Sequence, residues 1–359
     1  MDTTQAVKDP PFLRNVGLFL TYHCQASCAH CVVKAGPDRH EGVRLEDARD
    51  WIRQTASYRD HYVYVLSLTG GEPFSDLTLL RKVMELAAEC GLYISLVSNG
   101  FWATKRETAK RVLESLPEIC FLSISTDTYH QQFIPFERVK NAVWAMKECG
   151  IPYYISVVTE STDDAGFQRI NSELLEVTTA DRIRTGITFP VGRAAQMKSQ
   201  LKYALSDEPP KDVCQAASSP CIFPDGRVYG CIGPLFGLQQ EHPLLLGNAR
   251  ETPLADIFNK AETNVLLHAL RLWGPERLMS MLRGAGLSEH LPTKYVEGSV
   301  CNACLDLMSD PAVRQWLTQL EQDVEFRRKV AYGRLHYLNE TGMLELGGFS
   351  EEAPVRAQN

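Results

Sequence analysis

Short apolar runs alternate with longer amphipathic stretches over the first half of the chain. Six apolar runs predict strands, which begin at Val16, Tyr62, Leu92, Ile119, Tyr153 and Ile183. The stretches between them, such as 45–58, 76–90 and 136–149, carry apolar residues at helical spacing. Alternating strands and helices are typical of a parallel sheet covered by helices. We therefore expect an α/β fold with six strand–helix units, an open arc compared with an eight-unit barrel.

Two finer features of this half follow from local patterns. Thr104 and Glu107 have the spacing of a capping box, which predicts a helix start there. Cys90, Cys120 and Cys149 are far apart in apolar or helical surroundings, so we expect buried, reduced thiols.

The alternation stops after about residue 195, which indicates that a second unit follows. Residues 204–212 are polar and proline-containing, as in a linker, and residues 224–226 predict a hairpin turn between two short strands. A helical insertion is expected over 264–286 and an amphipathic closing helix over 311–338. The expected organisation is a barrel over 1–203, a second domain over 204–310, the closing helix within 311–345 and a flexible tail over 346–359.

Composition narrows the classes of function. The chain has 359 residues, is 44% hydrophobic and carries a net charge of −7 without any run of Lys and Arg, so nucleic acid is not an expected partner. No apolar run approaches the ~20 residues that span a bilayer, and the first residues do not resemble a signal peptide. We expect a cytoplasmic protein without disulfides and without a membrane partner.

Three cysteines follow the first predicted strand at the spacing C-x3-C-x2-C: Cys24, Cys28 and Cys31. A 4Fe-4S cluster or a tetrahedral metal needs four ligands, so three thiols leave one position for chemistry. A structural zinc site is the alternative.

Small and polar residues collect where the later strands end. They are Gly70, Gly71, Glu72 and Pro73 after the second strand, Ser98 and Asn99 after the third, Ser125 and Asp127 after the fourth, and Arg193 after the sixth. The carboxyl ends of barrel strands meet at one edge, where active sites lie, so these are candidate cofactor-binding residues. Ordinary turns, helix caps and a surface arginine are the alternatives.

The cysteine spacing, the G-G-E-P run and the P-V-G-R-A run at 190–194 together resemble the radical S-adenosylmethionine (SAM) superfamily. The resemblance implies a partial (β/α)6 barrel, a 4Fe-4S cluster on the three cysteines and SAM at its open iron. It further implies that Glu72 and its glycines bind the SAM amino group and that Arg193 holds its carboxylate. His30 departs from the family, in which this position is often aromatic.

A second group of cysteines lies in the C-terminal half: Cys214, Cys221, Cys231, Cys301 and Cys304. Their spacing resembles the SPASM extension of radical SAM enzymes and its shortened form, the twitch domain. Five cysteines cannot hold two clusters, so the resemblance implies one auxiliary 4Fe-4S cluster on Cys214, Cys231, Cys301 and Cys304. For Cys221 a ligand role, a hydrogen-donor role and a structural role stay open, and zinc is the alternative for the whole group.

Together these resemblances imply an enzyme that cleaves SAM and oxidatively modifies a ribosomally made peptide, by crosslinking or epimerisation. Expected partners are the peptide, an electron donor such as flavodoxin or ferredoxin and, because the first strand starts so early, a separate leader-binding protein. A dehydrogenase or epimerase of a small molecule, such as an aminoglycoside-type sugar, is the first alternative. A zinc-binding interaction module is the second.

Overall fold

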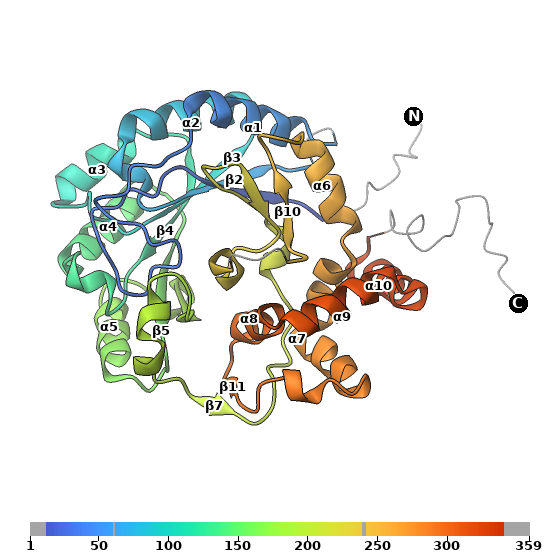
Figure 1. The fold of residues 1–359 in the computed structure, drawn as a ribbon. Coiled ribbons are helices and arrows are strands. Elements are labelled where there is room, and N and C mark those ends of the chain that lie inside the picture. The colour runs from blue at the N-terminus through green and yellow to red at the C-terminus, as the bar shows by residue number, and fades with distance from the viewer. Residues whose placement is uncertain (1–11, 60–61, 239–241, 341–359) are drawn as a thin grey trace, which may run out of the picture.

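The computed structural model describes residues 12–59, 62–238 and 242–340, and it contains one curved parallel sheet with helices along its outer side (Figure 1). The parallel strands run in sequence order. They are β1 (Asn15–Phe19), β2 (Val65–Thr69), β3 (Tyr93–Ser98), β4 (Ile119–Ser125), β5 (Tyr153–Thr159) and β6 (Ile183–Ile187). The expected partial (β/α)6 barrel is confirmed.

The helices between these strands cover the outer side of the arc. They are α1 (Leu45–Ser57), α2 (Leu77–Glu89), α3 (Arg106–Glu114), α4 (Phe136–Glu148) and α5 (Ala165–Leu175). Each helix buries one apolar stripe. On α2 this stripe consists of Leu80, Val83, Met84 and Ala87. This packing fixes the strands, so that their carboxyl ends meet at one edge.

The sheet continues into the C-terminal half of the chain. Strands β8 (Cys221–Ile222), β9 (Arg227–Tyr229) and β10 (Leu245–Asn248) extend it beyond β1, giving nine strands in the order β10-β9-β8-β1-β2-β3-β4-β5-β6. β8 pairs with β1 in parallel, and β8 and β9 form the expected hairpin. The second unit is therefore joined to the barrel by backbone hydrogen bonds.

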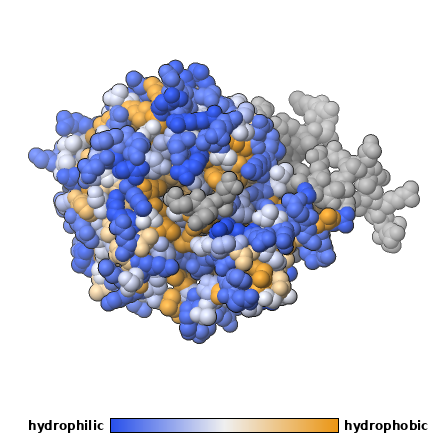
Figure 2. Space-filling model, in the orientation of Figure 1, coloured by the Kyte–Doolittle hydropathy of each residue, from blue (hydrophilic) through white to orange (hydrophobic). Residues whose placement is uncertain are grey.

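Five helices complete the C-terminal half on the open side of the arc (Figure 1). They are α6 (Leu254–Thr263), α7 (Val265–Gly284), α8 (Val300–Ser309), α9 (Pro311–Gln322) and α10 (Val324–Leu338). A two-stranded sheet of β7 (Leu205–Ser206) and β11 (Tyr295–Val296) links the end of the barrel to this region. In the view of Figure 2 the surface is largely hydrophilic, and apolar residues form scattered patches, several of them near the centre of the face.

Three expectations are wrong in detail. The closing helix is two helices, because the Asp323 carboxylate accepts a hydrogen bond from the Phe326 amide and starts α10 afresh. The capping box is absent, because α3 begins after Lys105, whose side chain makes no capping bond. Cys120 is exposed and Cys90 and Cys149 are half-buried, because Cys120 lies at the uncovered start of β4 and the other two cap the ends of α2 and α4.

The expected tail over 346–359 lies outside the described residues. Within the described part of the chain, no helix combines the length and the apolar character that crossing a membrane requires.

Candidate active site

The three cysteines at 24, 28 and 31 lie on the irregular loop that follows β1, and all three line one cavity of about 400 Å³. This volume is in the range of small-molecule sites. Backbone amides approach two of the sulfurs, since the Ala26 N–H donates to Cys24 Sγ at 3.4 Å and the Ala35 N–H to Cys31 Sγ at 3.3 Å. Within the described residues no fourth cysteine lines this cavity, so the chain offers three thiol ligands there.

The turn after β2 holds this cysteine loop from one side. The Glu72 amide donates to the His23 carbonyl at 2.8 Å, and a Cβ on Gly71 would lie only 2.2 Å from that same oxygen. Glycine is therefore required for this close approach. Gly70 and Gly71 line the cavity, and Pro73 begins the short 3-10 helix that ends the turn.

The Glu72 side chain is fully buried and is not part of the cavity wall. Its two carboxylate oxygens accept hydrogen bonds from the Phe74 amide, the Ser98 hydroxyl at 2.9 Å and the Asn99 amide at 2.7 Å. Burial raises the pKa of Glu72 to about 7, against the effect of these donors. Glu72 thus ties the end of β2 to the end of β3.

Asn99 connects that junction to the cysteine loop. Its side-chain amide nitrogen lies 3.5 Å from Cys24 Sγ, and its side-chain oxygen accepts a hydrogen bond from Gln25 at 3.0 Å. Ser98, Asn99 and Ser125 all line the cavity, as expected for the ends of neighbouring strands.

Asp127 and Arg193 act from behind the cavity wall. Asp127 accepts hydrogen bonds from the Tyr129 amide and from the His130 amide and ring, the latter at 2.7 Å. Arg193 donates to the Cys28 carbonyl at 2.6 Å and to the Ala35 carbonyl, and its backbone amide donates to the Cys31 carbonyl at 2.9 Å. Both terminal nitrogens of Arg193 are thus bonded to the cysteine loop, so its role toward the SAM carboxylate stays a prediction without support from these contacts.

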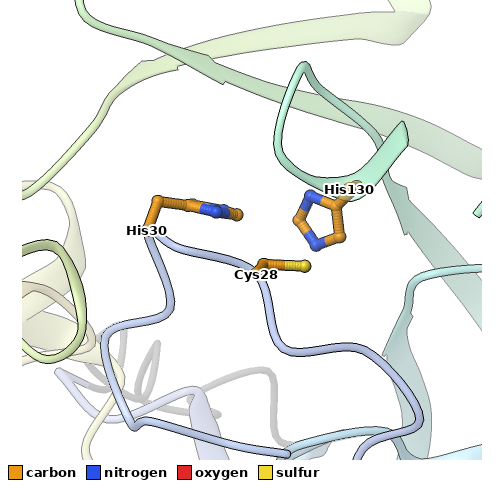
Figure 3. Close-up of side chains that lie close together, drawn as sticks. All are labelled: Cys28, His30 and His130. Carbon is orange, nitrogen blue, oxygen red and sulfur yellow. The ribbon is translucent and has the colours of Figure 1, made fainter. Parts of the chain in front are cut away.

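His130 is a cavity residue that the sequence pattern did not single out. Figure 3 shows it pointing toward Cys28 and His30, and one ligand atom of each lies within 4.8 Å of the others. Its spacing of three residues from Asp127 was the available signal. Burial lowers the pKa of His30 to about 4, so its imidazole is neutral, and its Nδ1 has no hydrogen-bond partner.

The second cysteine group gathers around the start of α8. Cys301 and Cys304 lie on this helix, and a Cβ placed on Gly233 would be 3.5 Å from Cys231 Sγ and 3.6 Å from Cys301 Sγ. Burial raises the pKa of Cys304 well above its usual value, and Cys231, Cys214 and Cys301 raise it further by charge repulsion. The structure therefore brings together the four thiols predicted as a ligand set.

Burial raises the pKa of the fifth thiol, Cys221, and the charge of Cys231 raises it further. It is buried on β8 among Phe19, Phe223 and Tyr229, and its Sγ faces Gly17 on β1. It is absent from the wall of the cysteine cavity, and the hydrogen-donor role stays a prediction.

The spacing of the sulfurs bears on the choice between zinc and a cluster. A tetrahedral zinc with Zn–S bonds of ~2.3 Å requires sulfurs about 3.8 Å apart. Among the described residues, the group of three ligand atoms that meets a 4.8 Å limit is Cys28, His30 and His130, and neither cysteine set does. Neither cysteine set is therefore held at the spacing of a tetrahedral zinc in the described part of the chain.

Comparison with known proteins places the chain. Residues 18–170 match the family model of the radical SAM superfamily. A relative from Bacillus subtilis (strain 168), named "Putative peptide biosynthesis protein YydG", is 24% identical over 309 residues, which cover 82% of this chain and 92% of the relative.

Among solved structures, native anSMEcpe with bound AdoMet (SAM) has a TM-score of 0.50 at 15% identity, covering 91% of this chain and 99% of that one. A second structure of anSMEcpe, with AdoMet and Cp18Cys peptide, has a TM-score of 0.46 at 17% identity and covers 69% and 81%. The likeness to native anSMEcpe with bound AdoMet shows a shared fold. The radical SAM family model thus matches residues 18–170, the part of the chain that carries the cysteine loop and strands β2 to β5 of the barrel.

Proposed function

We propose that the protein cleaves SAM reductively and uses the resulting hydrogen abstraction to modify a ribosomally made peptide, by crosslinking or epimerisation. The observation that carries this proposal is one cavity that joins three cysteine thiols to the carboxyl ends of β2, β3 and β4. The name of the relative YydG, a peptide biosynthesis protein, supports a peptide as substrate.

In this proposal Cys24, Cys28 and Cys31 hold a 4Fe-4S cluster and leave one iron to SAM. When bound, the two groups supply a 5'-deoxyadenosyl radical by one-electron cleavage of SAM. Gly70, Gly71, Ser98, Asn99 and Ser125 enclose the cofactor, and Glu72, Asp127 and Arg193 keep its surroundings in place.

We further propose that Cys214, Cys231, Cys301 and Cys304 hold one auxiliary 4Fe-4S cluster. A crosslink removes two protons and two electrons from the peptide. The cofactor takes one proton and one electron together as a hydrogen atom, and the second proton is lost to solvent. The second electron needs an acceptor. In this proposal it passes first to the auxiliary cluster and then to an external carrier such as ferredoxin or flavodoxin. We also propose that the second domain begins near residue 204 and that a separate protein binds the leader of the peptide.

Anaerobic purification followed by iron and sulfide analysis tests the cluster assignment. We expect about eight irons per chain, falling to about four when Cys24, Cys28 and Cys31 are replaced together by Ala. The matched control replaces Cys90, Cys120 and Cys149, three thiols outside both groups, and should keep all the iron. Zinc without iron would support the interaction-module alternative.

Formation of 5'-deoxyadenosine from SAM under dithionite tests the activity. The wild-type protein and the control variant should form it, and the variant lacking the first three cysteines should not. Activity in that variant would show that the cleaving cluster lies elsewhere.

Mass spectrometry of a candidate peptide distinguishes the products. Loss of two hydrogens indicates a crosslink, and uptake of one solvent deuterium without other change indicates epimerisation. Turnover of an aminoglycoside-type sugar, with no change in any short peptide encoded beside the enzyme, would favour the small-molecule alternative.

A further inference from the structure

A second cavity, of about 710 Å³, lies between the cysteine loop, the segment after β6 and helix α8. Val32, Val33 and Phe236 line both this cavity and the cysteine cavity, so the two spaces adjoin. A molecule bound in the second cavity therefore borders the place where hydrogen abstraction is proposed.

Among the charged residues in the described wall of this cavity, most are basic. Its ionisable side chains are Lys34, Arg39, Lys198, Arg227 and Asp306, together with three tyrosines. Arg39 is already paired with Glu41 at 2.9 Å and Arg227 with Asp225 at 2.7 Å.

Lys34 and Lys198 are different, because neither forms an ion pair within the described part of the chain. Both are exposed, and both line the cavity. Burial raises the pKa of Asp306 to about 6, and the positive charge of Lys198 acts against this rise. Two cations facing one space favour an anionic ligand.

The backbone conformation of Lys34 supports a functional role for this residue. Its φ of 55° lies in the left-handed region that side-chain-bearing residues rarely adopt. The Arg39 guanidinium donates to the Lys34 carbonyl at 3.2 Å while stacking on Tyr22, which helps to hold this conformation. Such strain is concentrated at functional sites.

We propose that this second cavity binds a carboxylate-bearing segment of the peptide substrate, with Lys34 and Lys198 pairing with the carboxylate. The proposal rests on the proposed function for the class of substrate. An acidic side chain and a peptide C-terminus offer the same group. The whole chain carries a net charge of −7 and repels anions at long range, so affinity for an acidic peptide must come from local contacts.

Fluorescence anisotropy with the anaerobic holoprotein tests the proposal. The probe is the fluorescein-labelled pentapeptide Ala-Glu-Ala-Glu-Ala, compared with its C-terminal amide, with its Gln counterpart, and with the Gln peptide amide. We expect the Gln amide to bind at least tenfold more weakly than the Glu acid. The two intermediate peptides show which carboxylate is bound.

Charge reversal provides the matched variants. Lys198→Glu should weaken the Glu peptide about tenfold and strengthen an Ala-Lys-Ala-Lys-Ala probe, whereas Lys82→Glu, on the exposed face of α2, changes the net charge equally and should do neither. Equal effects of the two variants, or equal binding of the Glu acid and the Gln amide, would overturn the proposal.

Displacement of the probe by saturating S-adenosylhomocysteine would also overturn it, since the lysines would then serve the cofactor. Cleavage of SAM by the wild-type protein without any peptide tests the proposed function separately. If the wild-type protein does not cleave SAM, the proposed function is wrong, whereas the peptide titration still tests the carboxylate site by itself.

Discussion

Single residues decide how closely the two halves of the molecule approach each other. Cys221 on β8 faces Gly17 on β1, and a Cβ on Gly17 would lie 2.4 Å from the Cys221 Sγ. The two residues pair directly in the parallel ladder. The thiol therefore fills the space that the glycine leaves, which supports the structural alternative for Cys221 and leaves its ligand and donor roles as predictions.

The first prediction concerns this pair. Gly17→Ala should destabilise the protein by about 1–3 kcal/mol, because the added methyl overpacks the sheet. In Cys221→Ala the sulfur is absent, so the double variant should lose less stability than the sum of the two single variants. Thermal and denaturant unfolding under anaerobic conditions measures the cycle.

Gly186→Ala on β6 is the control, because its new methyl would lie 3.6 Å from Val158, an ordinary contact. Additive effects in the cycle would contradict the structural role of Cys221. The iron content of Cys221→Ala adds a second result, since loss of iron would identify Cys221 as a ligand.

At the scale of elements, the cysteine loop is held between two other segments. The turn after β2 bonds to it through Glu72, and the segment after β6 bonds to it through Arg193. The pattern of apolar runs predicted all six strands of the barrel and which residues follow each strand. It could not show that Glu72 and Arg193 bond to backbone and to other side chains, because those partners are distant in sequence.

The second prediction concerns Arg193. Its side-chain bonds to the Cys28 and Ala35 carbonyls are charge-assisted, and such bonds contribute ~1.5–3 kcal/mol each. Arg193→Gln should therefore loosen the cysteine loop and release iron to a chelator at least tenfold faster than the wild type. Time-resolved loss of the cluster absorbance measures the rate.

Arg184→Gln on β6 is the matched control, because Arg184 is exposed and bonds to carbonyls of its own segment. If both variants release iron equally fast, Arg193 does not hold the loop. A changed KM for SAM with unchanged release of iron would instead support the predicted contact with the SAM carboxylate.

At the scale of the whole molecule, a buried network of charges fastens the C-terminal helices. Arg334 on α10 bonds to Glu262 at 3.1 Å and to Glu340 at 2.5 Å, and Glu340 also pairs with Arg271 at 2.7 Å. His268 completes the network, since its Nε2 lies 3.0 Å from the Glu262 carbonyl and its Nδ1 lies 2.9 Å from Arg271.

The third prediction is a dependence of stability on pH through His268. Burial lowers the pKa of His268 well below its usual value, and Arg334 and Arg271 lower it further. In the unfolded chain His268 binds a proton near pH 6.5, whereas in the folded protein it stays neutral at this pH. The folded state therefore loses stability as the pH falls below about 6.5. Glu262 and Glu340 face the same network, and Phe12 packs on the ring.

His268→Gln removes the titrating group and keeps a donor and an acceptor. Its melting temperature should fall less steeply than that of the wild type between pH 6.5 and about 5, because the slope for one proton is ~1.4 kcal/mol per pH unit. His336→Gln, at an exposed position on α10, should keep the wild-type slope. A His268→Gln slope equal to that of the wild type would contradict the prediction.

The sequence by itself determined the barrel and the positions of the cysteine loop and the strand-end residues, because strand–helix alternation and cysteine spacing are local patterns. It also identified four C-terminal cysteines that the fold brings together. Tertiary structure alone decided that β8 extends the barrel sheet, that His130 joins the cysteine cavity and that Lys34 and Lys198 face a second space. These features depend on contacts between segments far apart in the chain, which hydrophobic periodicity does not specify.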